Sequence, residues 1–161
     1  MKNVSVFLLS IFLVSLFACS SDSESGRPEA IVLDVYKSPT CGCCGKWVSH
    51  IEEKGFEVEV HNHNTLDPVK KKLGVPSHLQ SCHTGVSESG YFFEGHIPAK
   101  YITQFLSKPT EGAVGLAVPG MPAGSPGMEM GDQFSPYDIL LVNSDGSTEV
   151  FAKVSLYEEQ F

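Results

Sequence analysis

Residues 30–60, AIVLDVYKSPTCGCCGKWVSHIEEKGFEVEV, decide the fold of this 161-residue chain. Residues 30–36 are apolar and β-branched, which predicts a buried strand. Residues 46–54 place apolar side chains at helical spacing before Gly55, which predicts a short helix that ends at a glycine. Residues 56–60 alternate between apolar and acidic side chains, which predicts a second strand. Together these segments predict a β-α-β unit with a cluster of cysteines at the start of its helix.

Further elements follow this unit. Asp67-Pro68 predicts the start of a second helix that ends at Gly74. The segments after it predict a weak strand at 78–83, a turn at 87–90, a strand at 91–94, a helix at 98–107 and a hairpin of 138–143 with 148–154. This order is found in the thioredoxin fold, in which a cis-proline faces the cysteine motif, and Pro76 resembles that residue. We therefore expect an α/β, thioredoxin-like three-layer domain over residues 30–108, followed by a C-terminal extension over 109–161.

The N-terminus has the form of a targeting segment. Lys2 and the apolar run after it predict a secretory signal peptide over residues 1–18. This run is shorter than the ~20 residues of a membrane-spanning helix. It ends in LFAC, which resembles the lipobox of bacterial lipoproteins, so Cys19 is predicted to carry the lipid and the polar residues 19–29 to be a flexible tether. These features predict a periplasmic, membrane-anchored lipoprotein in a compartment that permits disulfides.

The composition excludes some classes of partner. The chain has 11 Lys and Arg against 19 Asp and Glu, a formal net charge of −8, and 42% hydrophobic residues. This composition is typical of a globular domain rather than a disordered chain. A basic surface for nucleic acid is not expected, because such binding depends largely on phosphate neutralisation. An acidic surface is compatible with metal cations. We expect a monomer.

The chemistry concentrates in the sequence CGCCG at residues 41–45. Cys41 and Cys44 have the C-x-x-C spacing of thiol oxidoreductases, and a helix N-terminus lowers a thiol pKa, so Cys41 is a candidate attacking residue and Cys44 a candidate resolving residue. Cys43 does not fit this pattern, because a third thiol offers a competing disulfide partner. Three such thiolates suit a soft metal, either Cu(I) or Zn(II).

Methionines distinguish the two metals. Every methionine except Met1 lies in residues 112–131, GAVGLAVPGMPAGSPGMEMG, which predict a loop. Thioether ligands favour Cu(I) over Zn(II), so Met121 and Met128 are candidate ligands and Met130 is a weaker one. The C-terminal hairpin is expected to hold this loop over the cysteine site.

Other candidate ligands lie on the strand expected after Pro76. Alternation along that strand predicts that Cys82 and His83 point to opposite faces, so one of them faces the cysteines, and Cys82 is preferred. His96 is a further candidate. The sequence HNH at residues 61–63 could bind metal weakly, but it is more typical of a solvated loop. His50 and His78 are expected to have no special role.

Four segments carry a specific resemblance: CGCCGKW at 41–47, LGVPSHLQSCHTG at 73–85, EGHIPA at 94–99 and GLAVPGMPAGSPGME at 115–129. They resemble the periplasmic CopG family associated with copper-resistance genes, which are thioredoxin-like proteins with a CxCC motif and a metal-binding C-terminal extension. The resemblance implies copper as the cofactor, with several ions held by cysteine sulfurs, and interconversion of Cu(I) and Cu(II). By position, the copper ligands would be Cys41, Cys43, Cys44 and Cys82, and less firmly Met121 and Met128.

Three functions stay open at this stage. The first is an extracytoplasmic copper-binding protein of copper resistance that cycles copper between its oxidation states, which would make it a copper oxidoreductase. The second is a metal-free thiol-disulfide oxidoreductase that uses Cys41 and Cys44. The third is a module that stores or transfers copper without redox turnover. Copper ions, copper efflux or delivery proteins and the membrane, through the lipid anchor, are the expected partners.

Overall fold

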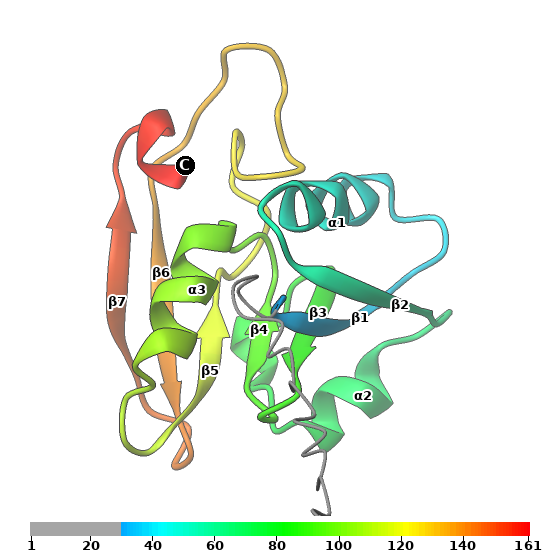
Figure 1. The fold of residues 1–161 in the computed structure, drawn as a ribbon, viewed down its shortest axis with the longest axis vertical. Helices are drawn as coiled ribbons and strands as arrows, with labels where there is room; N and C mark the ends of the chain where they lie inside the picture. The colour runs from blue at the N-terminus through cyan, green and yellow to red at the C-terminus, as the bar shows by residue number, and fades with distance from the viewer. Residues whose placement is uncertain (1–29) are drawn as a thin grey trace, which may run out of the picture.

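The computed structural model describes residues 30–161 as a mixed α/β fold (Figure 1). The predicted signal peptide, the predicted lipid-carrying residue Cys19 and the predicted tether lie outside the described residues. The strands are β1 (Val32–Lys37), β2 (Glu57–Asn62), β3 (His83–Ser87), β4 (Phe92–Glu94), β5 (Ala113–Ala117), β6 (Tyr137–Asn143) and β7 (Thr148–Val154). The helices are α1 (Gly42–Glu53), α2 (Asp67–Lys72) and α3 (Ala99–Ser107), with 3-10 turns η1 (Ser77–Leu79) and η2 (Tyr157–Gln160).

All seven strands form one sheet in the order β2-β1-β3-β4-β5-β6-β7. β1 pairs with β2 in parallel and with β3 antiparallel, β3 and β4 are antiparallel, and β4 and β5 are parallel. β6 and β7 form the expected hairpin, which β5 joins to the rest of the sheet. The C-terminal third of the chain therefore extends the same sheet.

Helices lie on both faces of the sheet (Figure 1). Trp47 of α1 and Phe105 of α3 pack in one large apolar cluster with Leu33 and Phe93 of the sheet. The opposite face carries α2, η1 and a smaller cluster around Leu79. Because Trp47 is fully buried and its indole N–H donates to the backbone oxygen of Ile97 at 2.9 Å, the cysteine-bearing helix is fixed against the segment before α3.

Several predicted boundaries differ from the structure. α1 begins at Gly42 rather than Lys46, so two cysteines lie in its first turn. Residues 77–79 form a 3-10 turn instead of a strand, because Leu79 buries its side chain in the smaller cluster. Residues 113–117 form β5, an interior strand between β4 and β6, rather than part of a loop.

The peptide bond before Pro76 is trans, as are all others in the described part of the chain. Pro76 precedes η1 with φ −58° and ψ 136°. None of the helices in residues 30–161 combines the length and the apolar character needed to cross a membrane.

Candidate metal centre

Three cysteines lie at the N-terminus of α1. Cys41 is the N-cap residue, and its sulfur accepts a hydrogen bond from the backbone N–H of Cys44 at 3.4 Å. Cys41 and Cys44 are joined by a disulfide, while Cys43 is a free thiol whose Sγ lies 3.4 Å from that of Cys41. Cys44 is fully buried and Cys41 is partly exposed. The predicted C-x-x-C pair therefore has the geometry of a redox pair with a third sulfur beside it.

Cys82 completes a group of four cysteines. The Sγ atoms of Cys41, Cys43, Cys44 and Cys82 all lie within 4.8 Å of one another. Burial, together with repulsion from the neighbouring Cys43, raises the pKa of Cys82 to about 12. A metal would have to displace the proton of Cys82, because the thiolate is the form that binds.

The expectation that Cys82 and His83 point to opposite faces is wrong. Cys82 lies in the bend before β3, and His83 is the first residue of the strand, so strand alternation does not yet apply to Cys82. The sulfur of Cys82 is 3.3 Å from Nδ1 of His83 and 3.1 Å from Nε2 of His96. These three residues form a second group of ligand atoms within 4.8 Å, which shares Cys82 with the first.

The two imidazoles are buried in different ways. His83 is fully buried against the Trp47 ring, with 4.3 Å between the ring centroids, and its Nε2 has no hydrogen-bond partner among the described residues. His96 is also fully buried, and its Nδ1 lies 2.8 Å from the backbone oxygen of Pro126. Because a carbonyl only accepts, Nδ1 of His96 carries the proton and Nε2 presents a lone pair toward Cys82. Burial lowers the pKa of both imidazoles, which keeps them neutral as ligands must be.

The glycine- and proline-rich loop covers this region. A Cβ atom built at Gly127 would lie 2.6 Å from the backbone oxygen of Cys43 and 2.8 Å from the backbone nitrogen of Trp47, so the loop backbone rests directly on α1. The side-chain amide of Gln160 donates to the oxygen of Gly124 at 3.0 Å and holds the loop from the C-terminus. The loop therefore lies against the first turn of α1, beside Cys43, and η2 holds it there through Gln160.

The predicted methionine ligands are placed differently from one another. Met121 is 53% exposed and Met130 is 57% exposed. Met128 is half-buried, and its backbone closes the turn over residues 124–128 through hydrogen bonds with Gly124 and Ser125. Met128 therefore belongs to the part of the loop that touches α1, whereas Met121 and Met130 face solvent.

A buried ion pair that the sequence analysis missed supports the loop of Cys82. Lys70 of α2 and Glu94 of β4 pair through their charged groups, with 4% and 0% side-chain exposure. Glu94 also accepts hydrogen bonds from the backbone N–H of Ser81 at 2.5 Å and from the hydroxyl of Thr84 at 2.6 Å. The pair fixes the residue before Cys82, and the only sequence signal was an acidic residue at the end of the apolar run YFFE.

We expect Gly127→Ala to open this cover. The residue has φ +86°, and its new methyl group would meet backbone atoms of α1, so the loop must move away from the helix. In the reduced, metal-free protein, the rate of alkylation of Cys43 should rise several-fold, measured by mass spectrometry of the modified peptides. Gly131→Ala is the matched control, because Gly131 has φ +60° in the same loop with no atom within 4 Å of the added methyl. Equal rates in both variants would contradict a covering role for this contact.

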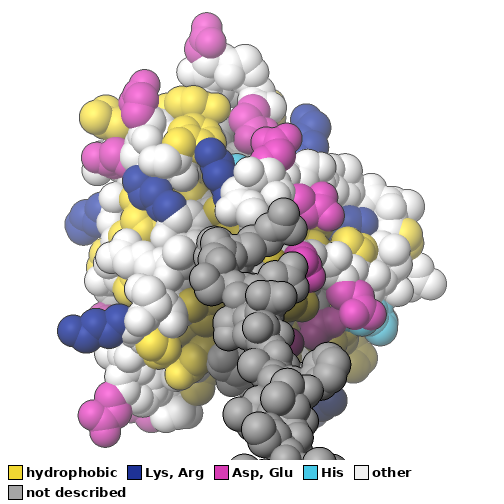
Figure 2. Space-filling view, in the orientation of Figure 1, with side chains coloured by type: hydrophobic (Ala, Val, Ile, Leu, Met, Phe, Trp, Pro, Cys, Tyr) yellow, Lys and Arg dark blue, Asp and Glu magenta, His cyan; other side chains and the backbone are white. Residues whose placement is uncertain are grey.

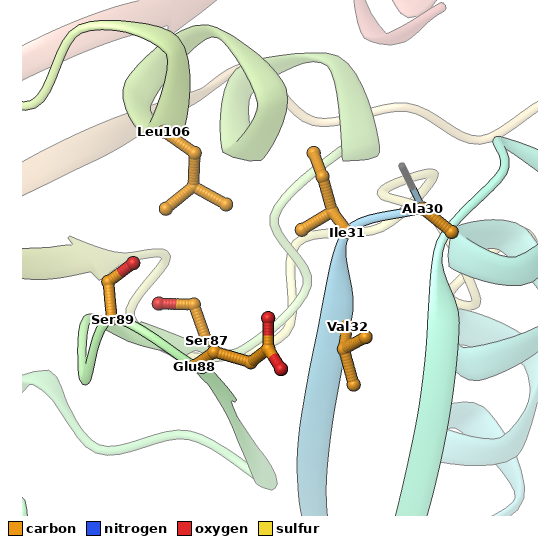
Figure 3. A pocket seen from close by; sticks show the side chains of 7 residues that line it. All are labelled: Ala30, Ile31, Val32, Ser87, Glu88, Ser89 and Leu106. Carbon is orange, nitrogen blue, oxygen red and sulfur yellow. The ribbon is translucent and has the colours of Figure 1, made fainter. Parts of the chain in front are cut away.

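A hollow lined by residues near the start of β1, the turn after β3 and α3 lies elsewhere (Figure 3). Its lining includes Ile31, Leu106 and the carboxylate of Glu88, and it contains none of the cysteines. The soft donor atoms therefore do not belong to this hollow.

The fold and the donor atoms together define a mixed α/β protein in which four cysteine sulfurs and two buried imidazoles meet beneath a loop. Comparisons with known proteins agree with this class. Residues 79–128 match the family described as "Protein of unknown function, DUF411". A search of curated proteins gave no match.

Two solved structures named copper resistance protein CopG, form 1 and form 2, are similar to this chain with a TM-score of 0.73. They are 44% and 43% identical to it, and the matches cover 78% of this chain and 98% and 99% of theirs. The chain belongs to the CopG copper-resistance family.

Proposed function

We propose that this protein binds copper through the sulfur atoms of Cys41, Cys43, Cys44 and Cys82 and cycles it between Cu(I) and Cu(II). The observation that carries the proposal is the convergence of these four sulfurs within 4.8 Å of one another. Soft thiolates select Cu(I), and sulfurs shared between ions allow several coppers to sit close together. The family's two similar structures, whose names refer to copper resistance, support copper as the cargo.

The surrounding residues fit a metal. His83 is fully buried, and its Nδ1 lies 3.3 Å from the sulfur of Cys82, so one ion would contact both atoms. Nε2 of His96 is already aimed at Cys82, and the contact of its Nδ1 with Pro126 fixes the ring. We include both imidazoles as ligands, with Met128 as the favoured thioether and Met121 as a second. The loop then excludes water from the site.

The mixed donor set suits a change of oxidation state. Thiolate and thioether sulfurs stabilise Cu(I), whereas imidazole nitrogens also bind Cu(II). In the form with the Cys41–Cys44 disulfide, only Cys43 and Cys82 among the four are free thiols. Exchange with an external dithiol, which is itself oxidised to a disulfide, would release Cys41 and Cys44 as two thiols, so full copper loading requires the reduced pair.

The metal and thiol content of the protein tests the proposal. Protein purified without oxygen from copper-supplemented cells should contain more than one copper per chain, and its thiols should react only after the metal is removed. Electron paramagnetic resonance should then show the Cu(II) signal appear when an added oxidant removes electrons and disappear when an added reductant returns them. Bound copper that stays Cu(I) throughout would contradict redox cycling and favour a module that stores or transfers copper. Copper-free protein with a readily formed disulfide would contradict copper binding altogether.

The disulfide supports one rival function, a metal-free thiol-disulfide oxidoreductase. Cys41 is partly exposed and Cys44 is fully buried, as an attacking and a resolving cysteine would be. This function requires neither Cys43 nor Met128. Reduction of insulin disulfides that survives loss of both residues would favour the rival.

We also propose a finer description of the fold. The order β2-β1-β3-β4, the parallel β1–β2 pair and the position of the cysteines directly after β1 support a thioredoxin-like unit over residues 30–108. Residues 109–161 are then its metal-binding extension. The trans bond before Pro76 departs from the cis-proline of that fold.

The cellular location is proposed from the sequence. The signal peptide over residues 1–18 and the lipobox ending at Cys19 support a periplasmic lipoprotein held at the membrane. Copper efflux or delivery proteins in the same compartment are its proposed partners. Metabolic labelling with a fatty acid should mark the wild type and not the Cys19→Ser variant.

A further inference from the structure

A third group of ligand side chains lies on the sheet away from the cysteines. Asp34 is on β1, and Glu59 and His61 are on β2; their ligand atoms lie within 4.8 Å of one another. The parallel register places Asp34 beside Glu59 and Tyr36 beside His61. The three side chains share no member with the cysteine group. Asp34 alternates with Leu33 and Val35, which point into the core cluster, so it lies on the other face of the sheet. The register puts Glu59 and His61 on the same face as Asp34.

The geometry brings three donors to one point. Nε2 of His61 is 2.6 Å from Oδ1 of Asp34 and 3.9 Å from Oε1 of Glu59. Ligand atoms of one cation with bonds near 2.0–2.2 Å are separated by about 3 Å, so small side-chain rotations convert this arrangement into a shared site. Their exposed fractions, 30% for His61, 42% for Asp34 and 74% for Glu59, leave the group open to ions in solution.

The two carboxylates of the group have no lysine or arginine partner among the described residues. Within residues 30–161, the only ionic partner of Asp34 and Glu59 is His61. Figure 2 shows acidic side chains beside a histidine on the right of the molecule, near β1 and β2. A divalent cation at this position would supply a fixed positive charge beside the two carboxylates.

A second imidazole lies close by. The backbone N–H of His63 donates to the oxygen of Lys37 at 2.9 Å, which continues the β1–β2 pairing beyond the last residue of β2. The ring of Tyr36 stacks on His61 at 4.8 Å between centroids and lies 5.8 Å from the ring of His63. Glu59, His61 and His63 therefore recur every second residue along one face, with Tyr36 between the imidazoles.

We propose that Asp34, Glu59 and His61 form a binding site for a divalent cation, with Cu(II) as the preferred ion. Oxygen and imidazole donors suit Cu(II) rather than Cu(I), and Cu(II) binds such sites most tightly among the first-row divalent metals. The site thus differs in its chemistry from the thiol cluster and does not depend on it.

The test uses a chain that cannot reduce Cu(II). The parent is the protein with Cys19, Cys43 and Cys82 replaced by serine and the Cys41–Cys44 disulfide left closed. Its fold is checked by circular dichroism. Titration with Cu(II) against a competing chelator gives stoichiometry and affinity, and electron paramagnetic resonance reports the donor atoms. We expect one Cu(II) with a signal typical of nitrogen and oxygen ligands.

His61→Gln in this parent should weaken Cu(II) binding by at least about tenfold and remove the nitrogen coupling. Asp34→Asn should weaken it in the same direction. His78→Gln is the matched control, because His78 is exposed on η1 and belongs to none of the three ligand groups. Three outcomes would overturn the proposed site. They are an unchanged Cu(II) affinity in His61→Gln, an equal loss of affinity in His78→Gln, and a parent protein that binds no Cu(II). The four-cysteine group cannot form in any of these samples. Failure of the Asp34, Glu59 and His61 site is therefore distinguishable from failure of the proposed copper site at the cysteines.

Discussion

Cys43→Ser should lower the amount of Cu(I) that the reduced protein binds by at least one ion per chain. The thiol of Cys43 lies 3.4 Å from Cys41 and belongs to the same four-sulfur group as Cys82, so the substitution removes a shared soft ligand. The ions that remain should bind at least about tenfold more weakly. Stoichiometry and affinity are measured without oxygen by competition with a Cu(I) chelator.

Cys19→Ser is the matched control, because it removes one thiol that is predicted to carry the lipid rather than to bind copper. The same Cys43→Ser protein separates the candidate functions. A metal-free oxidoreductase needs only Cys41 and Cys44, so it should keep or improve its disulfide exchange when the competing thiol is removed. Full copper stoichiometry in Cys43→Ser would contradict the proposed cluster.

Lys70→Met should lower the free energy of unfolding by about 3–5 kcal/mol. The substitution leaves the carboxylate of Glu94, which is fully buried, without its cationic partner. Only the hydrogen bonds from Ser81 and Thr84 would remain to stabilise the charge. Urea denaturation followed by tryptophan fluorescence measures the effect, since Trp47 is the one tryptophan of the chain and lies in the core.

Lys71→Met on the same helix is the control, because Lys71 is exposed and should tolerate the change with little loss of stability. The double variant Lys70→Met/Glu94→Gln should recover part of the loss, because it replaces the unpaired carboxylate with a neutral amide. A Lys70→Met protein within about 1 kcal/mol of the wild type would show that the ion pair does not stabilise the fold.

Local patterns predicted much of the fold. The apolar run of residues 30–36 and the alternation at 56–60 correspond to β1 and β2, and Asp145-Gly146 marks the turn of the β6–β7 hairpin. β5 was not predicted, because the short AVGLA is an apolar run among glycines without a clear period. Its strand forms because it fills the place between β4 and β6. A neighbour in space, rather than a local preference, decides such a segment.

The sequence by itself determined the chemistry of this protein. The chain has three cysteines in four residues, a fourth at Cys82, and methionines among glycines. These residue types predict a soft-metal site in any fold that brings their sulfur atoms together. Tertiary structure decided which donors meet. It placed Cys82 before β3, where its sulfur contacts both His83 and His96, and it separated the exposed Met121 from Met128.

The partners of two further groups also followed from tertiary structure alone. Lys70 and Glu94 are 24 residues apart, and Asp34 and His61 are 27 residues apart, so no local pattern links either pair. Strand register and helix packing bring them into contact. Residue types determine what a site binds, because donor chemistry is a property of side chains, whereas their distances depend on contacts that are distant in the sequence.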